Sequence, residues 1–567
     1  MSNLLVGPLV RAIGPDGVVI WTEWSHPCEV TLTASPDHVQ GQEPGTFLVL
    51  SRTITVGGHY YALSRLTGLQ SATWYSYQIG TGAQERAHSS PTEGTIIQCF
   101  RTLDPPNAGN ALRLAYGSCR KLSSPEPDAL NALASWLVRF IDEREAMWPR
   151  LLLLIGDQIY ADEHIGRRKQ VRFPQQHVQA SQRAAQSFEA FARMYVEAWT
   201  SDEGIRQVFA LLPTYMIFDD HEIINAWNMY PLWRARALQR GLEQTLVDGL
   251  VAYWVYQGWG NIGLRSADEH VLLAIMQQAA HNGEDVLEDL RGCIRHAIYE
   301  ETALEWHFAI PTTPPIFVAD VRADRPAVLG YTNSADVVPR IMSREQMVKL
   351  RTWSQEHAAS MALLVSSVPI LLPPLIGFAE YVTGVRPFHR VSSGPVRQLG
   401  QALTGIQQKL ALRMSFDHWP AFGATWHELI ELLAMREQDM VILSGDVHFS
   451  YAMAARRIFF PSRRRHAVLY QFVASPFRNK LEQRDKRLIL GQAWIKRTIY
   501  GGVSTHMLPL LQAKGAKPVP SGMLFQNVVA LVTFWPQTQD MGKYCIRHVY
   551  LGVKNRVLEE IGAVVVD

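Results

Sequence analysis

Short apolar runs recur along the chain, and four of them lead directly into residues that can bind metal ions. Each run has the length and composition of a buried strand, and Asp, His, Cys or Tyr follows at once. Strand ends that carry such ligands are how an α/β protein assembles a site for several metals. The four segments are Tyr116–Arg120, Leu151–Tyr160, Met216–Glu222 and Val441–His448.

The first hundred residues have a different pattern, with short β-rich runs separated by turn residues. This regular spacing predicts an all-β sandwich of the fibronectin or immunoglobulin type over residues 1–104. The stretch Asp104–Asn110 contains paired prolines and a glycine, so it is the predicted linker. The predicted strands are Gly17–Trp24, Glu29–Ala34, Thr53–Val56, His59–Leu63 and Thr73–Ile79.

From Leu112 onwards, strands alternate with helices, which predicts an α/β catalytic domain over residues 111–510. Apolar residues at helical spacing predict helices at Ala129–Trp148 and Gln182–Trp199. Helical segments are expected near 230–300, as a cap or an insertion, and near 380–415, as a variable loop and a helix. Strands within 511–567 are expected to complete the catalytic domain; they are Asn527–Phe534, Lys543–Tyr550 and Ile561–Val566.

One uncharged stretch, Met361–Phe378, approaches the ~20 residues that a membrane-spanning helix needs. Three prolines interrupt it, at 369, 373 and 374, so the favoured interpretation is a buried strand followed by an apolar loop. No transmembrane segment is therefore predicted. A membrane-surface contact through this stretch stays open as the alternative.

Composition excludes some classes of protein. The 567 residues carry a net charge of +2, which gives no electrostatic reason to expect nucleic-acid binding. The five scattered cysteines do not suggest a disulfide framework, and Met1–Pro8 lacks the pattern of a secretory signal. We therefore expect a cytoplasmic protein, with peripheral membrane association as an alternative. The oligomeric state cannot be read from the sequence.

Two of the four segments are rich in carboxylates. Asp157 ends an apolar strand, where a dehydrated carboxylate needs a cation or strong donors, so it could bridge two metals; the alternative is a helix N-cap. Asp219, Asp220, His221 and Glu222 are consecutive, and a bound cation would hold the adjacent carboxylates ionised. His221 is a candidate metal ligand or general acid. Asn225 follows it at helical spacing and could face the same site.

The other two segments add a cysteine, a further aspartate and a second histidine to the candidate ligands. Asp446 and His448 are two residues apart on what should be an extended segment, so both would point to one side as a chelating pair. Cys119 lies between Gly117-Ser118 and Arg120 at a strand-to-loop edge. A lone cysteine on a β-rich run is often a small core residue, and here the core and ligand interpretations are evenly balanced.

In motif order, the chain resembles the alkaline phosphatase D family of the metallophosphoesterase superfamily. The residues that carry the resemblance are Gly117–Cys119, Gly156–Tyr160, Asp219–Glu222 and Ser444–His448, with weaker matches at Asp320–Arg322 and Asp417–Pro420. The resemblance implies a two-sheet core flanked by helices (α/β/β/α), with metals gathered at the strand ends.

The resemblance also implies roles for single residues. Cys119 and Tyr160 would be ligands of Fe(III), which anionic thiolate and phenolate stabilise better than neutral imidazole does. Asp157 would bridge, Asp220 and Asn225 would suit Ca²⁺, and Asp446 with His448 would complete the set. Similar ligands would also hold Mn²⁺ or Zn²⁺.

The activity implied is hydrolysis of phosphoric esters, either monoesters or diesters. A metal-bound hydroxide would attack phosphorus, and His221 would protonate the leaving group. Arg120 and Arg322 could pair with the phosphate oxygens. The substrate would be a small phosphate ester or a phospholipid. The alternatives are a non-catalytic protein that binds a phosphorylated ligand or a partner, and an enzyme that hydrolyses phospholipids at a membrane surface.

Overall fold

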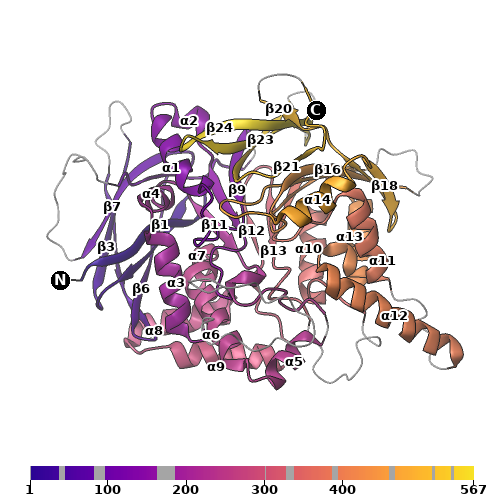
Figure 1. The fold of residues 1–567 in the computed structure, drawn as a ribbon. Coiled ribbons are helices and arrows are strands. Elements are labelled where there is room, and N and C mark those ends of the chain that lie inside the picture. The colour runs from indigo at the N-terminus through magenta and orange to yellow at the C-terminus, as the bar shows by residue number, and fades with distance from the viewer. Residues whose placement is uncertain are drawn as a thin grey trace.

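The protein has a mixed α/β fold, with several sheets and helices packed around them (Figure 1). This confirms the predicted α/β class. The computed structural model describes residues 2–37, 45–81, 96–106, 108–162, 186–230, 232–300, 302–326, 338–385, 394–458, 467–513, 517–537 and 542–566.

The N-terminal region is all-β, as predicted, and consists of two four-stranded sheets. Side chains alternate along the strands; in β3, for example, Val30, Leu32 and Ala34 are buried while the residues between them are partly exposed. One sheet has the order β1-β2-β6-β5, with β1 Leu4–Ile13, β2 Gly17–Trp24, β5 Ile54–Val56 and β6 His59–Thr67. The other has the order β4-β3-β7-β8, with β3 Glu29–Pro36, β4 Phe47–Arg52, β7 Trp74–Thr81 and β8 Cys99–Arg101.

A seven-stranded sheet contains the first three strands that precede candidate ligands. Strands β9, β10 and β11 are parallel neighbours, and their almost continuous apolar sequences are buried. The antiparallel strand β22 pairs with the other edge of β9. The order is β11-β10-β9-β22-β23-β24-β20, with β9 Leu112–Gly117, β10 Leu151–Ile155, β11 Thr214–Ile217, β20 Leu511–Gln512, β22 Val528–Pro536, β23 Tyr544–Lys554 and β24 Val557–Val566.

A nine-stranded sheet contains the fourth such strand, β15. Strands β13, β14, β15 and β17 are parallel, and the remaining described neighbours at the two ends are antiparallel. Its main order is β12-β13-β14-β15-β17-β16-β19-β18, with β21 paired to β16. The bounds are β12 Phe308–Ile310, β13 Ile316–Ala319, β14 Ala362–Ser366, β15 Met440–Ser444, β16 Ser450–Arg457, β17 Leu469–Val473, β18 Arg497–Tyr500, β19 Val503–Met507 and β21 Met523–Leu524.

Helices lie around the two large sheets (Figure 1). The helix predicted at Ala129–Trp148 is in fact two helices, because the first ends at Arg139 and the next begins at Arg144. The helix predicted from Gln182 begins at Phe188; residues 182–185 lie outside the described ranges. The helices before residue 300 are α1 Ala129–Arg139, α2 Arg144–Met147, α3 Phe188–Thr200, α4 Glu203–Leu211, α5 Trp233–Gln239, α6 Glu243–Tyr253, α7 Trp259–Asn261, α8 Val271–Asn282 and α9 Leu287–Tyr299. Those after it are α10 Arg344–Glu356, α11 Pro374–Gly384, α12 Pro395–Met414, α13 Gly423–Ala434 and α14 Gln483–Gly491.

Within the helical region 230–300, α7 contacts both the N-terminal strands β1 and β2 and the strand β11 of the first large sheet. A single π-helical turn, Trp254–Gly258, joins α6 to α7. The buried Arg11 of β1 donates hydrogen bonds to the backbone carbonyls of Tyr256 (3.0 Å) and Gln257 (2.5 Å) and to Asn261 Oδ1 (2.9 Å). The Asn261 side chain in turn bonds the backbone of β11 at Met216. The N-terminal region is thus connected to the strand that leads to Asp219.

The uncharged stretch Met361–Phe378 contains the buried strand β14, as predicted. The apolar loop after it ends at Pro374, where α11 begins. None of the helices in the described part of the chain has both the length and the hydropathy needed to cross a membrane.

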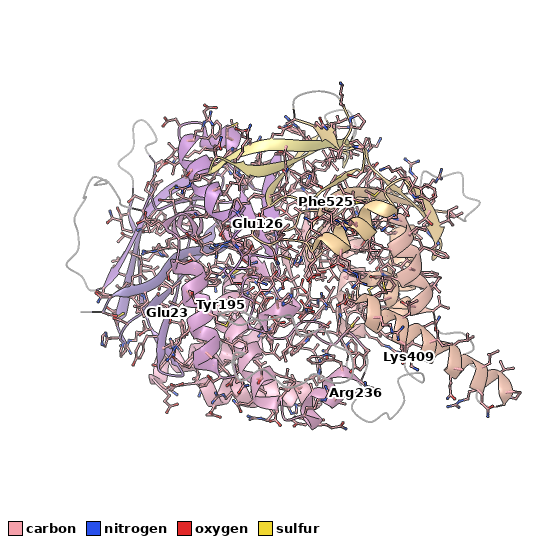
Figure 2. The ribbon with its side chains drawn as sticks, in the orientation of Figure 1. Glu23, Glu126, Tyr195, Arg236, Lys409 and Phe525 are labelled. Carbon is pink, nitrogen blue, oxygen red and sulfur yellow. The ribbon has the colours of Figure 1, made fainter. Side chains whose placement is uncertain are left out.

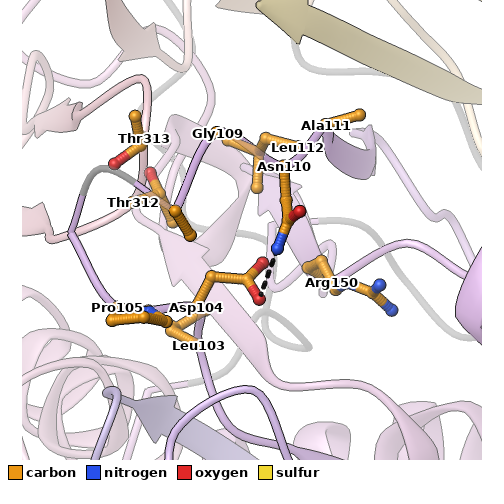
Figure 3. A pocket seen from close by; sticks show the side chains of 11 residues that line it. Leu103, Asp104, Pro105, Gly109, Asn110, Ala111, Leu112, Arg150, Thr312 and Thr313 are labelled. Atoms are coloured by element: carbon orange, nitrogen blue, oxygen red, sulfur yellow. Dashed lines mark hydrogen bonds between the residues drawn. The ribbon is translucent and has the colours of Figure 1, made fainter.

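The predicted linker lines a pocket at the amino ends of β9 and β10 (Figure 3). In it, Asn110 Nδ2 donates a hydrogen bond to Asp104 Oδ1 (3.3 Å). This pocket lies at the opposite ends of these strands from the candidate ligands. The boundaries proposed for the domains, at 104, 111 and 510, stay a prediction.

Candidate metal centre

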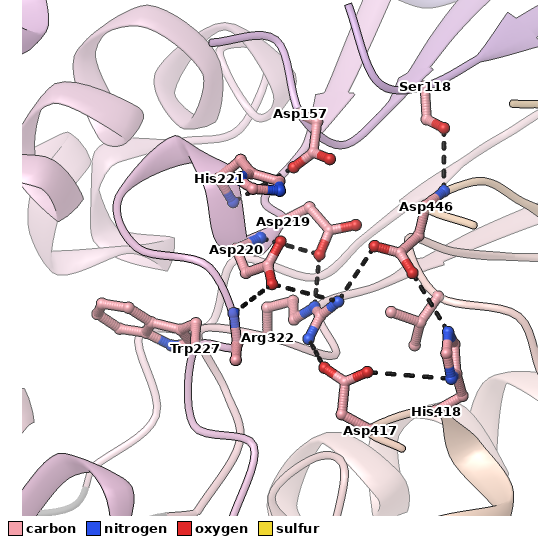
Figure 4. A network of polar contacts seen from close by, with 12 residues as sticks. Ser118, Asp157, Asp219, Asp220, His221, Trp227, Arg322, Asp417, His418 and Asp446 are labelled. Atoms are coloured by element: carbon pink, nitrogen blue, oxygen red, sulfur yellow. Dashed lines mark hydrogen bonds and ion pairs between the residues drawn. The ribbon is translucent and has the colours of Figure 1, made fainter. Parts of the chain in front are cut away.

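The carboxyl ends of parallel strands from both large sheets meet at one cluster of ionisable side chains (Figure 4). Cys119 follows β9, Asp157 follows β10, and Asp219 and Asp220 follow β11. From the second sheet, Arg322 follows β13 and Asp446 follows β15. Parallel strands that end at one rim therefore bring together residues more than three hundred positions apart in the chain.

Two glycines allow the loops to approach one another this closely. A Cβ atom on Gly156 would lie 2.6 Å from Asp219 Cβ, and Gly156 has a φ of +88°. A Cβ atom on Gly445 would lie 2.3 Å from Ser118 Oγ. Because only glycine fits at these two positions, the Gly-Asp pairs of the sequence place Asp157 and Asp446 inside the cluster.

Four of the predicted ligands have left-handed backbone conformations. The φ angles are +60° at Cys119, +55° at Asp157, +67° at Asp446 and +60° at His448. Such conformations are uncommon for residues with side chains and concentrate at functional sites. The expectation that Asp446 and His448 lie on an extended segment is wrong, because β15 ends at Ser444 and the chain turns sharply after it.

Asp157 lies at the centre of the cluster. Potential ligand atoms lie within 4.8 Å of one another in three groups: Cys119 with Asp157 and His448, Asp157 with Asp220 and His221, and Asp157 with Asp219 and Asp446. Asp157 is common to all three and is fully buried. No helix follows Asp157 within the described residues up to 162, so the helix N-cap interpretation is wrong.

The thiol and the phenol predicted as ligands lie at one corner of this cluster. Cys119 Sγ lies 3.3 Å from Asp157 Oδ2, and Tyr160 Oη lies 3.3 Å from the same atom. Tyr160 Oη is also 3.4 Å from His448 Nε2, and Asn479 Nδ2 is 2.9 Å from Tyr160 Oη. Burial lowers the pKa of His448 to about 4. Its imidazole is therefore neutral at pH 7, which is the form that binds metals.

The opposite side of the cluster is a group of carboxylates around Arg322 (Figure 4). The Arg322 guanidinium contacts Asp219 and Asp417, and its Nη2 lies 3.3 Å from Asp446 Oδ1. Arg322 was expected to bind phosphate, whereas here it neutralises carboxylates. Its own loop is fixed by Asp320 Oδ1, which accepts hydrogen bonds from the backbone N–H groups of Arg322 (3.0 Å) and Ala323 (2.8 Å).

Arg322 does not satisfy all the carboxylate oxygens. Asp219 Oδ2 and Asp220 Oδ1 are buried and have no hydrogen-bond partner among the described residues. Burial raises the pKa of Asp219 and of Asp220 above the usual range. Buried carboxylate oxygens without a donor are costly, and a hard cation would satisfy them. The residues present therefore fit a bound metal ion.

His221 forms a pair with a carboxylate outside the cluster. Its Nδ1 lies 2.9 Å from Asp162 Oδ1, and Asp162 Oδ2 also accepts the backbone N–H of Asn225 (2.9 Å). Burial opposes the charged imidazolium, but Asp162 and Asp157 raise the pKa of His221 well above its usual value. The helical spacing expected between His221 and Asn225 is wrong, because the 3-10 turn Asp220–Glu222 ends after one turn. Asn225 nevertheless lies beside the cluster, because its backbone N–H is hydrogen-bonded to Asp162, the partner of His221.

Glu222 joins the loops after β10 and β11. Its carboxylate accepts hydrogen bonds from the backbone N–H groups of Asp157 (3.2 Å), Gln158 (2.8 Å) and Asp219 (3.0 Å). It also accepts one from Gln257 Nε2 (3.2 Å) in the π-helical turn. The fourth residue of the Asp-Asp-His-Glu motif thus positions the other ligands.

Arg120 has a role different from the phosphate contact that was expected. Its guanidinium faces Asp128 (2.8 Å) and Asp202 (3.3 Å) and contacts the carbonyl of Ala198. These partners lie at the start of α1 and around the end of α3, so Arg120 fastens the loop after β9 to both helices.

Four further polar residues lie at the site, and the sequence pattern did not assign them a role. Asp162, two positions after Tyr160, could have been found by its closeness to the motif. His418 lies in a segment that matched the family only weakly; its Nε2 lies 3.2 Å from Asp446 Oδ2 and its Nδ1 lies 2.7 Å from Glu380 Oε1. Glu380 lies within helix α11 and Asn479 lies six residues after β17, so neither is the first polar residue after a strand, and the pattern did not mark them.

An α/β fold with ligand-bearing strand ends and a carboxylate-rich cluster defines a class of protein with a candidate site for several cations. Comparison with protein families and solved structures gives a closer assignment than this broad class. Residues 136–257 match the model of the PhoD-like phosphatase family, and residues 1–94 match a domain of unknown function (DUF7800). The solved structure titled "Structure of PhoD" has the same fold, with a TM-score of 0.54 at 13% sequence identity. The match covers 98% of this chain and 91% of that one. No curated protein sequence matches the chain.

The resemblance to the alkaline phosphatase D family is therefore confirmed. The chain contains a PhoD-like phosphatase region, and its fold is similar to that of PhoD. The matched region 136–257 includes Asp157, Tyr160, Asp220 and His221. The segments around Cys119 and Asp446, which lie outside this region, join the same cluster in space.

Proposed function

We propose that the protein is a metal-dependent phosphoric ester hydrolase, acting on monoesters, diesters or both. The observation that carries this proposal is the position of Asp157, which belongs to three groups of candidate ligands at once. A carboxylate shared in this way is suited to bridge two cations. The PhoD-like phosphatase match of the surrounding region supports a phosphate ester as substrate.

Two kinds of cation fit the two sides of the cluster. Cys119, Tyr160, Asp157 and His448 would hold Fe(III), because thiolate and phenolate are anionic ligands that suit a trivalent ion. Asp157, Asp220 and the neighbouring Asp219 and Asp446 would hold Ca²⁺, with Asn225 as a further oxygen ligand. When bound, such cations polarise the phosphoryl group and neutralise the charge that develops on its oxygens. Mn²⁺ or Zn²⁺ would suit similar ligands.

The chain's own residues would bind, orient and protonate the substrate. Asp162 holds Nδ1 of His221, so the other ring nitrogen is the one that could deliver a proton to the leaving oxygen. Glu222 fixes the backbone at Asp157 and Asp219, which keeps the ligand geometry independent of the substrate. Arg120 is not assigned a role in substrate binding, because its guanidinium is already paired with Asp128 and Asp202.

The first test is turnover of p-nitrophenyl phosphate and bis-p-nitrophenyl phosphate by purified protein supplied with iron and calcium. Asp157→Asn should remove most of the bound metal and lower turnover by at least ~100-fold. The matched control Asp289→Asn, at an exposed position of α9, should retain both. No turnover of either ester by protein with a full set of bound metals would contradict the proposal and favour a non-catalytic phosphate-binding protein.

A second comparison tests the role of His221. His221→Gln should lower turnover by roughly 10²–10⁴-fold on phenyl phosphate, whose leaving group needs a proton, and by less on p-nitrophenyl phosphate. His281→Gln, at an exposed position of α8, is the control. Equal losses on both esters, with metal lost as well, would instead make His221 a metal ligand.

A further inference from the structure

Helix α12 has an apolar stripe on its outward side. Its large apolar residues follow one another at spacings of three and four, which places them on one face of the helix. Ile406 is 65% exposed and Leu399 is 55% exposed. The stripe consists of Val396, Leu399, Leu403, Ile406, Leu410 and Met414, all of which are exposed.

The face of α12 that packs on the protein is made of other residues. Gly400 and Thr404 are buried, and Gln407 Nε2 donates a hydrogen bond to the carbonyl of Val382 in α11 (2.7 Å). Most surface helices turn the apolar face inward and the polar face to water. α12 does the reverse, and it projects away from the body of the molecule (Figure 1).

The neighbouring helix α11 extends this apolar surface. Leu375, Phe378 and Val382 are exposed on it, again at spacings of three and four, and Val385 follows just after its end. The two helices contact each other. The two helices expose nine large apolar residues and Val385 adds a tenth, whereas scattered single residues are the norm on a soluble protein.

The charge on α12 indicates what would cover this surface. The helix contains Arg397, Lys409 and Arg413 and no acidic residue, and Lys409 is exposed (Figure 2). Pairing of α12 with a second copy of itself would bring like charges together without any carboxylate to balance them. An anionic lipid surface matches both the apolar stripe and the cations, as in amphipathic helices that lie in the membrane interface.

We propose that α11 and α12 form a docking surface for an anionic membrane. The helices would lie in the interface plane, with the apolar stripe in the lipid and Lys409 and Arg413 near the headgroups. This places the contact on α12 and the exposed side of α11, which includes Leu375 and Phe378 at the end of the stretch Met361–Phe378, whereas β14 in the same stretch is buried. Docking is independent of the proposed catalysis, since it rests on exposed residues outside the metal centre.

The same two helices are directly connected to the metal centre. Glu380 of α11 is buried and pairs with His418, which contacts Asp446. His418 lies four residues after the end of α12. The docking surface and the contact with the metal centre therefore share one helix, because Glu380 and the exposed Leu375, Phe378 and Val382 all belong to α11.

The test is co-sedimentation of the full-length protein with vesicles. Binding is expected to an equimolar mixture of phosphatidylcholine and phosphatidylglycerol, and it should weaken with added salt. Ile406→Glu should lower the bound fraction by about tenfold or more, because it puts a charge in the middle of the stripe. The matched control Leu488→Glu replaces a leucine of α14 that is 60% exposed, and it should bind like the wild type.

Three results would overturn the proposal. One is a wild-type protein that stays in the supernatant with the mixed vesicles. Another is an Ile406→Glu variant that binds as well as the wild type. The third is a dimer in analytical ultracentrifugation that Ile406→Glu dissociates, without vesicle binding, which would assign the stripe to a second copy. An unchanged thermal unfolding midpoint of Ile406→Glu would exclude misfolding as the cause of lost binding. None of these measurements depends on enzymatic activity.

Discussion

At the scale of single residues, the positive charge of Arg322 lies within a group of carboxylates whose oxygens also suit metal ions. Its side chain is 1% exposed, and it faces Asp219, Asp220, Asp417 and Asp446. Breaking a buried ion pair on one side is strongly destabilising, because the remaining charges are left uncompensated. A metal ion at the same carboxylates would take over part of that compensation.

Arg322→Met should therefore lower the free energy of unfolding of the metal-free protein by about 3–5 kcal/mol. Added Ca²⁺ should recover part of this loss, because it binds the folded state. Urea unfolding with a chelator and with Ca²⁺ measures both effects. The control Arg295→Met removes a partly exposed pair with Glu243 and should cost less than ~1 kcal/mol. A metal-free variant as stable as the wild type would refute the expectation.

The residues of the cluster were predictable where chemistry follows directly on an apolar run, as at Asp157, Asp220 and His221. A strand end fixes where such a side chain emerges, so local sequence is enough. Glu380 and Asn479 could not be predicted in this way, because tertiary packing alone brings them to His418 and Tyr160. The partners of Arg120 were missed for the same reason.

At the scale of elements, the strands were easier to predict than the connections between them. The segment after β15 was expected to be extended, but Asp446 and His448 have positive φ values that no hydrophobic pattern reveals. The helix predicted at Ala129–Trp148 is interrupted at residues 140–143, although the apolar spacing continues across the break. Element type follows from periodicity, whereas boundaries depend on local backbone conformations.

One contact between elements predicts a dependence of stability on pH. His59 of β6 lies between Glu23 of β2 (2.9 Å) and Glu189 of α3 (2.6 Å). The hydrogen bond with Glu23 and the contact with Glu189 raise the pKa of His59 above 6.5, although burial opposes this. The protonated histidine therefore stabilises the fold fully below pH 6.5, and this stabilisation is lost as the pH rises through the raised pKa.

Replacing His59 by Gln should lower stability by about 1 kcal/mol at pH 6 and by less at higher pH. The measurement is the difference in urea midpoint between wild type and variant across this range. Titrating groups that do not contact His59 are the same in both proteins and cancel in the difference. A difference that stays constant or grows with pH would contradict the assignment of His59 as the charged partner.

At the scale of the whole molecule, the N-terminal β region and the α/β region share buried contacts. Arg11 lies among the carbonyls of the π-helical turn, where burial lowers its pKa to about 9. Trp21 Nε1 donates a hydrogen bond to the carbonyl of Val255 (3.0 Å), and Tyr61 Oη bonds Tyr256 Oη (3.1 Å). Residues that are predicted to form a separate domain thus fill part of the core around α6 and α7.

Deletion of residues 1–104 should therefore prevent cooperative folding of the remainder. The truncation would expose the aromatic surface around Tyr256 and leave buried carbonyls without donors, each at a cost of about 1–3 kcal/mol. Size-exclusion chromatography and thermal unfolding of the truncated chain measure this. A soluble fragment that unfolds in one sharp transition would show that the N-terminal region is dispensable for folding.

The pairing of β9 with β22 has a consequence for the order of events during synthesis. Tyr116 of β9 lies opposite Ala530 of β22, about 400 residues later in the chain. At typical rates of translation, β22 is synthesised roughly 20–80 s after β9, the strand that leads to Cys119. Until then β9 has an open edge in the sheet, and open edges invite pairing with other chains. The nascent protein thus carries this open edge until late in translation, by which time all the proposed metal ligands have been made.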